Sequence, residues 1–539
     1  MRLKRLKRLA VLLGVFLCMG IFSSEAAASG ETYHVTTLDL SENNRVLIKT
    51  SHPIEALRVK KKSYPLAEET VYSYNIKRFN YKAGTLEIVK REFANGDFFL
   101  FTKVDNNKRF HFYMELDWSF SPDAELELKE FSQFPKPAGE SAAMGEDRTS
   151  YPTGLLDIQQ AGQTIKQIMI GKSYQSIEHI KRYEYANKSV IRELKAEADA
   201  VTKTETEEGK NVAISLQSTG KDIVEQWLMF SDSKLFESEK ELLSWMKYSS
   251  LNYRKTNKWY TSDGPYNKMV LTVEPQPRSK MGYGRTLLNF REAEAFDRWN
   301  KTNERYYYNL VSNSVADLLN FRGEKTFWET EVTSTYLLDL YNMTAPFIDT
   351  RFNEYIALYL RDVGEALAVS HLREPLLSYA DFLLSQIETG NVIPVNEQGA
   401  LIPDYFAVYD PVLTHTSLNH GLGGLNILLE AYLSTSDEKY LRGAEIVQEG
   451  ISGLDTQWLR EDGDTWYKVN PDLTFIGRDY ELLTLEDLLK TYGLWSKINQ
   501  ENLPIIETFL ESKSSYLKNN GIKIPSHTQE LLYSYGIGN

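Results

Sequence analysis

The pattern of hydrophobic and polar residues changes about half-way along the chain. In the first part, residues 31–131, apolar and polar residues tend to alternate, which is typical of β-strands. The clearest example is residues 109–117, in which every second residue is apolar: Phe110, Phe112, Met114 and Leu116. Residues 98–104 form a second apolar strand. The polar residues 105–108 between the two strands predict a hairpin.

Strand-like patterning continues beyond a linker that is rich in Pro, Gly and Ser at residues 133–141. It returns over residues 211–230 and 268–274, with an exposed polar turn at 204–210. We therefore expect a β-rich, sandwich-like N-terminal half. It is expected to contain one β-rich domain at residues 31–135 and a mixed, mainly β domain at residues 136–300.

From about residue 305 the apolar residues recur every three or four positions, as in Ile356, Leu360, Val363 and Leu367. This spacing predicts amphipathic helices. The expected helices lie at residues 305–321, 330–342, 352–370, 374–388, 416–434, 437–453, 480–497 and 503–519. Thr435 and Glu438 have the spacing of a capping box at the start of one of them. Eight helices with short links within pairs indicate stacked helical hairpins over residues 301–539, either a solenoid or a closed (α/α) toroid. The fold class is therefore α+β and multidomain.

The first 28 residues have the features of an export signal. Five basic residues precede an uncharged apolar run from Leu9 to Phe22, and the small residues Ala26 to Ala28 suit cleavage by a signal peptidase. The run is shorter than the roughly 20 residues of a membrane-spanning helix. We expect a secreted or cell-surface bacterial protein that meets the membrane only through this signal, with an uncleaved anchor as the alternative. Cys18, the only cysteine, would leave with the signal.

Composition and charge exclude several classes of protein. The 539 residues carry a formal net charge of −13, which argues against a nucleic-acid-binding protein. A single cysteine excludes a disulfide scaffold and a zinc site built on cysteines. His415 and His420 are five residues apart, so they do not share a helix face as zinc ligands do, and we expect no metal. We also expect no cofactor, because the chain has no Walker loop, dinucleotide fingerprint or nucleophile elbow.

Several motifs follow one another in a fixed order between residues 379 and 497. They are Ala380–Gln386 with Gly390 and Ile393–Pro394, then His420–Leu433, Ser436–Leu441, Trp466–Tyr467, Pro471 and Leu482–Trp495. In order and spacing, this quarter of the chain resembles the C-terminal helical domain of the D-glucuronyl C5-epimerases. Lys468, Val469 and Asn470 stand where that family carries Glu and Tyr, and the C-terminus also differs from the family pattern.

The resemblance implies a β-domain followed by an (α/α) toroid whose groove holds an acidic polysaccharide. The reaction of that family removes the C5 proton of a uronic acid and returns a proton to the opposite face. It needs an acid, a base and groups that stabilise the charge which builds up on the carboxylate. In the family, tyrosines and a glutamate serve as acid and base.

Ionisable and aromatic residues concentrate in the loops between the predicted helices. The catalytic candidates are Tyr405, His415 and Tyr480, and the candidates for binding sugar are Arg351, Asp404, Tyr409, Asp410, His420, Trp466 and Tyr467. Arg351 could hold a uronate carboxylate in its bidentate fork, or Asp349 could cap a helix while Arg351 pairs with Glu354. The other candidates could line a sugar groove or simply pack the loops and cap helices.

The function expected from these features is that of a secreted, carbohydrate-active protein that acts on a uronic-acid-containing polysaccharide or oligosaccharide as a C5-epimerase-like isomerase. The alternatives are a polysaccharide lyase or a glycoside hydrolase on an (α/α) toroid. A non-catalytic glycan-binding surface protein is also consistent with the unmatched segment at residues 468–470. A basic cluster in the N-terminal half could supply a local positive face to an anionic polymer: Arg58, Lys60, Lys61, Lys62, Lys77, Arg78 and Lys82.

Overall fold

The structure of the chain is a computed structural model that describes residues 33–41, 44–79, 81–137, 144–207 and 209–537. The expected export signal with Cys18 lies outside the described residues. Residues 138–141 of the expected linker lie outside them too. No helix in the described ranges combines the length and the apolar character that crossing a bilayer would require.

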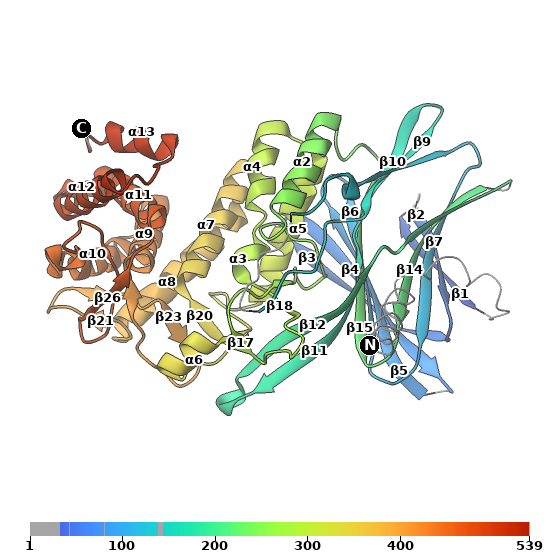
Figure 1. The fold of residues 1–539 in the computed structure, drawn as a ribbon, viewed down its shortest axis with the longest axis horizontal. Coiled ribbons are helices and arrows are strands. Elements are labelled where there is room, and N and C mark those ends of the chain that lie inside the picture. The colour runs from blue at the N-terminus through green and yellow to red at the C-terminus, as the bar shows by residue number, and fades with distance from the viewer. Residues whose placement is uncertain (1–32, 42–43, 80, 138–143, 208, 538–539) are drawn as a thin grey trace, which may run out of the picture.

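Two β-sheets and a layer of helices are stacked in the N-terminal part (Figure 1). The smaller sheet has the order β1-β2-β7-β14-β13. Its strands are β1 (His34–Ser41), β2 (Asn44–Thr50), β7 (Phe112–Phe120), β13 (Val201–Thr206) and β14 (Gly209–Ser218).

The larger sheet has the main order β16-β18-β12-β11-β15-β6-β5-β4-β3, to which β8, β9 and β10 are attached. Its strands are β3 (Ile54–Tyr64), β4 (Ala67–Arg78), β5 (Tyr81–Phe93), β6 (Phe98–Asn106), β8 (Glu125–Glu130), β9 (Gly154–Gln160), β10 (Gln163–Ile170), β11 (Ser173–Arg182), β12 (Lys188–Ala198), β15 (Asp222–Ser231), β16 (Asn267–Lys268) and β18 (Gly282–Gly284). Strand β3 forms an edge of this sheet.

Strand β6 explains why the layers stack in this order. Its residues are apolar without interruption from Phe98 to Phe101 because both of its faces are buried. Phe98 and Leu100 pack in the core between the two sheets, whereas Phe99 and Phe101 pack in the core beneath the helices. A strand that is covered on both sides needs apolar residues at every position.

The hairpin that the sequence predicts between residues 98–104 and 109–117 is wrong. β6 pairs with β5 and β15 in the larger sheet, while β7 pairs with β2 and β14 in the smaller one. The chain therefore crosses from one sheet to the other at residues 107–111. The alternation within the second segment is confirmed, because Phe112, Met114 and Leu116 are buried. The same pairings join strands from both sides of residue 135, so the two expected β-domains form one two-sheet unit.

Most helices of the described residues lie in the C-terminal half, and α2 precedes it. The helices are α2 (Glu239–Leu251), α3 (Leu287–Phe290), α4 (Ala293–Thr302), α5 (Arg305–Arg322), α6 (Thr335–Tyr341), α7 (Thr350–Ala366), α8 (Glu374–Glu388), α9 (Leu418–Thr435), α10 (Glu438–Gly453), α11 (Leu482–Ile498), α12 (Leu503–Asn519) and α13 (Ser526–Ser534). Short strands lie between them: β17 (Val273–Glu274), β19 (Thr333–Ser334), β20 (Phe347–Asp349), β21 (Ile393–Pro394), β22 (Ala400–Leu401), β23 (Tyr405–Ala407), β24 (Thr416–Ser417), β25 (Trp466–Val469) and β26 (Phe475–Arg478).

The eight helices expected from the sequence correspond to α5 through α12. Helices α2, α3 and α4 lie inside the segment that was expected to be mainly β, and α13 lies beyond the last expected helix. The expected capping box at Thr435 is wrong, because Thr435 ends α9. The side chain of Asp437 caps α10 instead by accepting a hydrogen bond from the backbone N–H of Lys439 at 3.0 Å.

The helices form a consecutive series of hairpins in which α5, α7, α9 and α11 pack side by side. Helix α9 lies at the centre of this series, in contact with α7, α8, α10 and α11, and it is buried on almost every side. In Figure 1 the series runs from α2 and α4, beside the large sheet, to α12 and α13 at the opposite end of the molecule. The structure thus shows a β-rich N-terminal half and a half built of helical hairpins, and does not by itself show a closed toroid.

Candidate functional site

Asp404 is the centre of a buried cluster at the N-terminal ends of α7 and α9. It is fully buried, and its carboxylate accepts hydrogen bonds from the backbone N–H of Ser417 at 2.6 Å and from the Ser417 hydroxyl at 2.8 Å. Ser417 is the residue that precedes α9, so the carboxylate lies at the positive end of that helix. Burial alone would raise the pKa of Asp404, but the neighbouring His420 and His415 and the bond from Ser417 lower it below its usual range.

The ring of His415 lies between the Asp404 carboxylate and a tyrosine hydroxyl. The hydroxyl of Tyr341 lies 2.6 Å from Nδ1 of His415, and Nε2 lies 3.2 Å from the Asp404 carboxylate in an alignment too poor for a hydrogen bond. Burial raises the pKa of Tyr341, so its hydroxyl stays protonated and donates a hydrogen bond to Nδ1. Both ring nitrogens of the fully buried His415 therefore face protein groups.

His420 differs from His415 because one of its nitrogens has no protein partner. Its Nδ1 lies 2.8 Å from the hydroxyl of Thr350 and 3.8 Å from the Asp404 carboxylate. The Thr350 hydroxyl can donate to the backbone oxygen of Asp404 at 2.9 Å, and the nearby carboxylate favours a proton on Nδ1. Within the described ranges no hydrogen bond reaches Nε2 of His420, and the side chain is 10% exposed. This arrangement leaves a lone pair on Nε2.

Four tyrosine rings extend this buried core toward solvent. Tyr405 lies 5.8 Å from the ring of His420, and Tyr336 and Tyr467 each lie 6.3 Å from the ring of His415. Tyr480 packs edge-to-face on Tyr467 at 5.7 Å. Tyr336 and Tyr480 are 43% and 50% exposed, so they form the rim of the site. We call the residues of this site the tyrosine–histidine cluster: Tyr336, Tyr341, Asp404, Tyr405, His415, His420, Tyr467 and Tyr480.

Two tyrosines of the cluster keep their protons, and its rim carries a cation. Burial, together with the nearby charge of Asp404, raises the pKa of both Tyr405 and Tyr467, so their hydroxyls keep their protons near neutral pH. The Nζ atom of Lys468 lies 2.9 Å from the hydroxyl of Tyr336. No carboxylate in the described part of the chain forms an ion pair with Lys468, so its charge is available to an anion.

The structure brings together six of the ten predicted site residues: Asp404, Tyr405, His415, His420, Tyr467 and Tyr480. Trp466 lies on β25 with the Arg460 guanidinium 4.9 Å from its ring. Among the described residues, no ring contact joins Trp466 to the cluster. Tyr409 and Asp410 lie in the exposed turn after β23.

The interpretation of Arg351 as a residue that holds sugar is wrong. Arg351 is 5% exposed, and its Nη2 atom donates to both carboxylate oxygens of Asp487 at 2.7 and 2.8 Å. Its Nη1 atom pairs with Glu354 at 2.6 Å. The alternative prediction that Asp349 caps a helix is confirmed. Its carboxylate accepts a hydrogen bond from the backbone N–H of Phe352 at 2.9 Å at the start of α7. The pair with Glu354 is present too, but it is buried and not at the surface.

Sequence reasoning missed Tyr336 and Tyr341 of the cluster and its neighbours Thr350 and Lys468. The two tyrosines lie on α6, whose short amphipathic pattern carries no chemical signal. Thr350 follows the helix cap Asp349, and Lys468 was noted only as a departure from the family pattern. The described residues contain no group of three or more His, Cys, Asp or Glu that could hold a metal ion.

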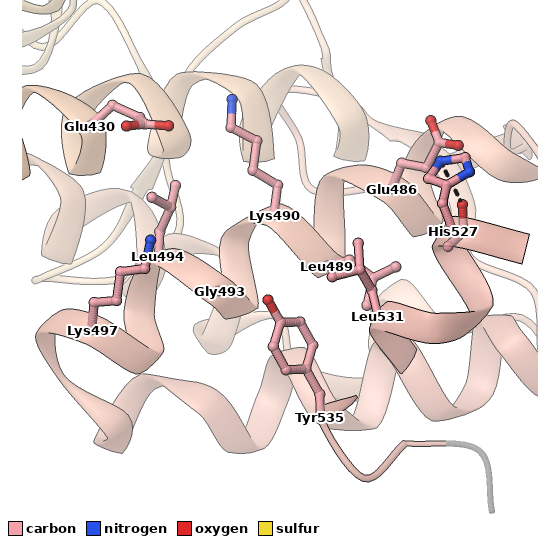
Figure 2. A pocket seen from close by; sticks show the side chains of 11 residues that line it. Glu430, Glu486, Leu489, Lys490, Gly493, Leu494, Lys497, His527, Leu531 and Tyr535 are labelled. Carbon is pink, nitrogen blue, oxygen red and sulfur yellow. Dashed lines mark hydrogen bonds between the residues drawn. The ribbon is translucent and has the colours of Figure 1, made fainter. Parts of the chain in front are cut away.

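A groove of about 450 Å³ lies apart from this cluster, between α11 and α13 (Figure 2). Its apolar part is formed by Leu489, Leu494 and Leu531, and the Tyr535 hydroxyl is directed toward α11 at Gly493. A side chain at Gly493 would collide with that hydroxyl, so the glycine permits the close approach of Tyr535. None of the predicted site residues lines this groove.

No known protein family matches the chain, and no curated protein is similar to it. Among solved structures, the chain is similar to a D-mannose isomerase, with 14% identity and a TM-score of 0.31 over 43% of this chain and 56% of that one. A family 76 glycoside hydrolase from a bovine Bacteroides thetaiotaomicron strain has 11% identity and a TM-score of 0.36, over 85% of this chain and 78% of that one.

A cellobiose 2-epimerase from Bacillus thermoamylovorans B4167 has 13% identity and a TM-score of 0.36, over 52% of this chain and 71% of that one. These three neighbours are carbohydrate-active enzymes, and none of them is a D-glucuronyl C5-epimerase. The chain spans little more than half the length of the D-mannose isomerase.

Proposed function

We propose that this chain is an exported, carbohydrate-active enzyme that transfers a proton at C5 of a uronic-acid residue in a polysaccharide. The observation that carries the proposal is the orientation of His420, whose Nδ1 faces Thr350 and Asp404 and whose Nε2 has no partner among the described residues. A histidine that Thr350 and a nearby carboxylate orient in this way can act as a general base through Nε2.

His420, two tyrosines of the cluster and the neighbouring Lys468 have roles in such a transfer. Nε2 of His420 takes the C5 proton, and the electron pair of the C–H bond moves into the adjacent carboxylate as an enolate. The Lys468 ammonium stabilises the negative charge that builds up there. Return of a proton from a tyrosine hydroxyl to the opposite face of C5 completes an epimerisation, and Tyr405 and Tyr467 are the candidate donors because both keep their protons.

A lyase step uses the same base. If the enolate instead expels the oxygen at C4, a double bond forms between C4 and C5, and a tyrosine hydroxyl protonates the departing oxygen. Hydrolysis by two free carboxylates finds less support, because glycosidases place two carboxyl groups on either side of the bond. Asp404 and Asp349, the buried carboxylates at these helix ends, are both bound to backbone N–H groups.

A glycan-binding protein without catalysis is the second candidate, favoured by the half-exposed rings of Tyr336 and Tyr480 beside Lys468. Incubation of the purified chain with polyglucuronate- or alginate-type polymers in deuterated water separates these functions. Deuterium at C5 supports epimerisation, ultraviolet absorbance from a new double bond supports a lyase, and binding with neither signal supports the binding protein.

Variants at the cluster test the roles of individual residues. His420→Gln should reduce deuterium uptake by about 10²- to 10⁴-fold, which is the usual contribution of general acid–base catalysis. Tyr405→Phe and Tyr467→Phe should reduce return of the proton, and the exposed Tyr409→Phe serves as the matched control. Unchanged uptake by His420→Gln, with normal folding and binding, would contradict the assignment of the base.

A further inference from the structure

A second surface of the molecule carries an unusual concentration of positive charge. Strand β3 forms the free edge of the large sheet, and its residues from Glu55 to Ser63 are exposed. Four consecutive or nearly consecutive basic residues lie on it, in a chain whose net charge is −13. We call this surface the β3 edge, and its basic residues are Arg58, Lys60, Lys61 and Lys62.

The charges of the β3 edge are largely free. Lys62 lies 3.8 Å from the buried Glu69, but no carboxylate in the described ranges forms an ion pair with Arg58, Lys60 or Lys61. These residues are opposite Ser73, Val71 and Thr70 on β4, so no acidic side chain faces them directly across the strand pair. The edge therefore presents positive charge that the protein itself does not neutralise.

Arg58, Lys60 and Lys62 project on the side of the sheet that faces the helices. Their cross-strand partners show this, because Lys62 pairs with Glu69, which binds Arg91 together with Asp317 of α5. Alternate residues of a strand are about 7 Å apart, so the three charges form a regular row. The row ends where Nζ of Lys62 donates to Asn320 of α5 at 3.1 Å.

A cavity of about 430 Å³ continues the row beyond Asn320. Its lining brings in four further basic residues: Lys188, Arg285, Arg322 and Lys325. Arg285, Lys325 and Arg322 are paired with Glu331, Glu329 and Glu374. Lys188 has no ion-pair partner among the described residues. Asp263, Glu329 and Glu331 line the cavity as well, so Lys188 is the basic residue of its lining whose charge no described carboxylate pairs with. The side chains of Phe321 and Phe327 add apolar surface.

Aromatic residues extend the opposite end of the edge. The hairpin between β4 and β5 lies beside the start of β3, where Lys77 pairs with Glu55. It presents Phe79 and Tyr81, which are 83% and 78% exposed, next to Arg78 and Lys82. Exposed aromatic rings among cations suit a polymer that has both apolar ring faces and anionic groups.

We propose that the β3 edge and the adjoining cavity form a binding site for an acidic polysaccharide, outside the tyrosine–histidine cluster. The proposal rests on the proposed function, which supplies an anionic sugar polymer as the ligand. The overall negative charge of the protein repels such a polymer elsewhere and directs it to this edge. The site shares no residue with the cluster, so it holds a part of the polymer other than the residue that the cluster processes.

Lysines on a free edge strand also have a protective role, because they prevent pairing with the edge of another molecule. The two roles give different results when the charge is removed. Loss of a protective charge would cause self-association through the exposed Leu57 and Val59 without affecting polysaccharide binding. Loss of a binding charge would weaken binding while the protein stays monodisperse.

The test compares two triple variants of the full chain. Arg58→Gln/Lys60→Gln/Lys61→Gln removes three charges from the edge. Lys234→Gln/Lys240→Gln/Lys247→Gln removes three exposed charges from the segment around α2, none of which pairs with a carboxylate that the structure describes. Lys62 is left unchanged because it contacts Glu69 and Asn320. Binding of fluorescently labelled polyglucuronate is measured by anisotropy at low and physiological ionic strength, and the oligomeric state is measured by size-exclusion chromatography.

We expect about tenfold weaker binding for the β3-edge variant, a smaller dependence on salt, and unchanged binding for the control variant. Equal affinities of the two variants would overturn the proposal, as would self-association of the β3-edge variant with unchanged binding. Single-stranded DNA or phosphatidylserine vesicles that bind as tightly through the same residues would also overturn it, in favour of a general polyanion surface.

Failure of this proposal can be distinguished from failure of the proposed reaction. The β3-edge variant should keep full deuterium uptake with the smallest uronate oligosaccharide that the cluster accepts, because that substrate needs no second binding site. His420→Gln should bind the long polymer normally but lose uptake. A wild-type protein that binds the polymer through the β3 edge without any uptake would refute the reaction alone.

Discussion

Replacement of Asp487 by alanine tests the structural role assigned to Arg351. Arg351 lies between three inner helices, where it binds Asp487 of α11 with two hydrogen bonds and Glu354 of its own helix with one. Its Nη1 atom also donates to the backbone oxygen of Asn419 at 3.2 Å, next to His420 on α9. The variant leaves a buried guanidinium without its bidentate partner.

The size of the effect follows from burial. Removing one partner of a buried ion pair costs about 3–5 kcal/mol because the remaining charge stays buried and uncompensated. Glu354 still pairs with Arg351 in the variant, so we expect a loss near the lower limit, about 3 kcal/mol of unfolding free energy. The pair between Arg45 and Asp39 has a similar distance, 2.6 Å, but both side chains are more than 60% exposed. Asp39→Ala should therefore cost less than about 1 kcal/mol.

Urea unfolding followed by tryptophan fluorescence measures both losses. Trp458 and Trp495 are fully buried in the core around α9 to α12, and Trp118 is buried in the core beside the small sheet that carries Asp39. The double variant Arg351→Met/Asp487→Leu removes both charges and should recover most of the stability that Asp487→Ala loses. A loss for Asp487→Ala no larger than that for Asp39→Ala would refute the reasoning. Arg351 would then be free to meet a ligand, as the sequence first suggested.

Two further predictions concern the surroundings of the cluster. Gly423→Ala places a methyl group against Glu354 and Arg351 and should lower the free energy of unfolding by about 1–3 kcal/mol, measured with urea. The control is Gly421→Ala, whose new methyl group meets only Thr416 at 3.2 Å and which should lose less stability. The depressed pKa of Asp404 contributes stability that is present above its unfolded pKa of about 3.9 and is lost as the pH falls through the folded value. The difference in melting temperature between wild type and Asp404→Asn should therefore narrow below about pH 4, and a difference that stays constant from pH 7 to pH 3 would contradict the assigned shift.

The helical half could be predicted from the sequence because its helices bury one face in a continuous core. A stripe of apolar residues every three or four positions is visible without knowledge of the neighbouring helices. The strands could be recognised in the same way, but their pairing could not. The alternation in residues 112–120 is the same whichever strand lies beside it, so proximity in sequence suggested a hairpin where the chain changes sheets.

The site was predicted only as far as its residues lie in one loop. Asp404, Tyr405, His415 and His420 fall within 17 residues and attract attention as a group. Lys468 and the tyrosines of α6 come from distant segments, and only the fold brings them to the loop. The error at Arg351 has the same origin, because a guanidinium fork fits a uronate and a buried aspartate equally well. The sequence contains no indication that Asp487 lies opposite.

The arrangement of the inner helices explains why these separate segments meet. In a series of helical hairpins alternate helices run in the same direction, so α7, α9 and α11 begin at the same end. Asp349 caps α7, Ser417 precedes α9, and Tyr480 lies just before α11, which places the candidate residues at three adjacent helix starts. Helix N-termini carry partial positive charge and stabilise anions. The backbone N–H of Ser417 contributes in this way to the low pKa of Asp404, after the larger effects of His420 and His415. The charge on an enolate formed beside His420 would be stabilised by the same kind of donor.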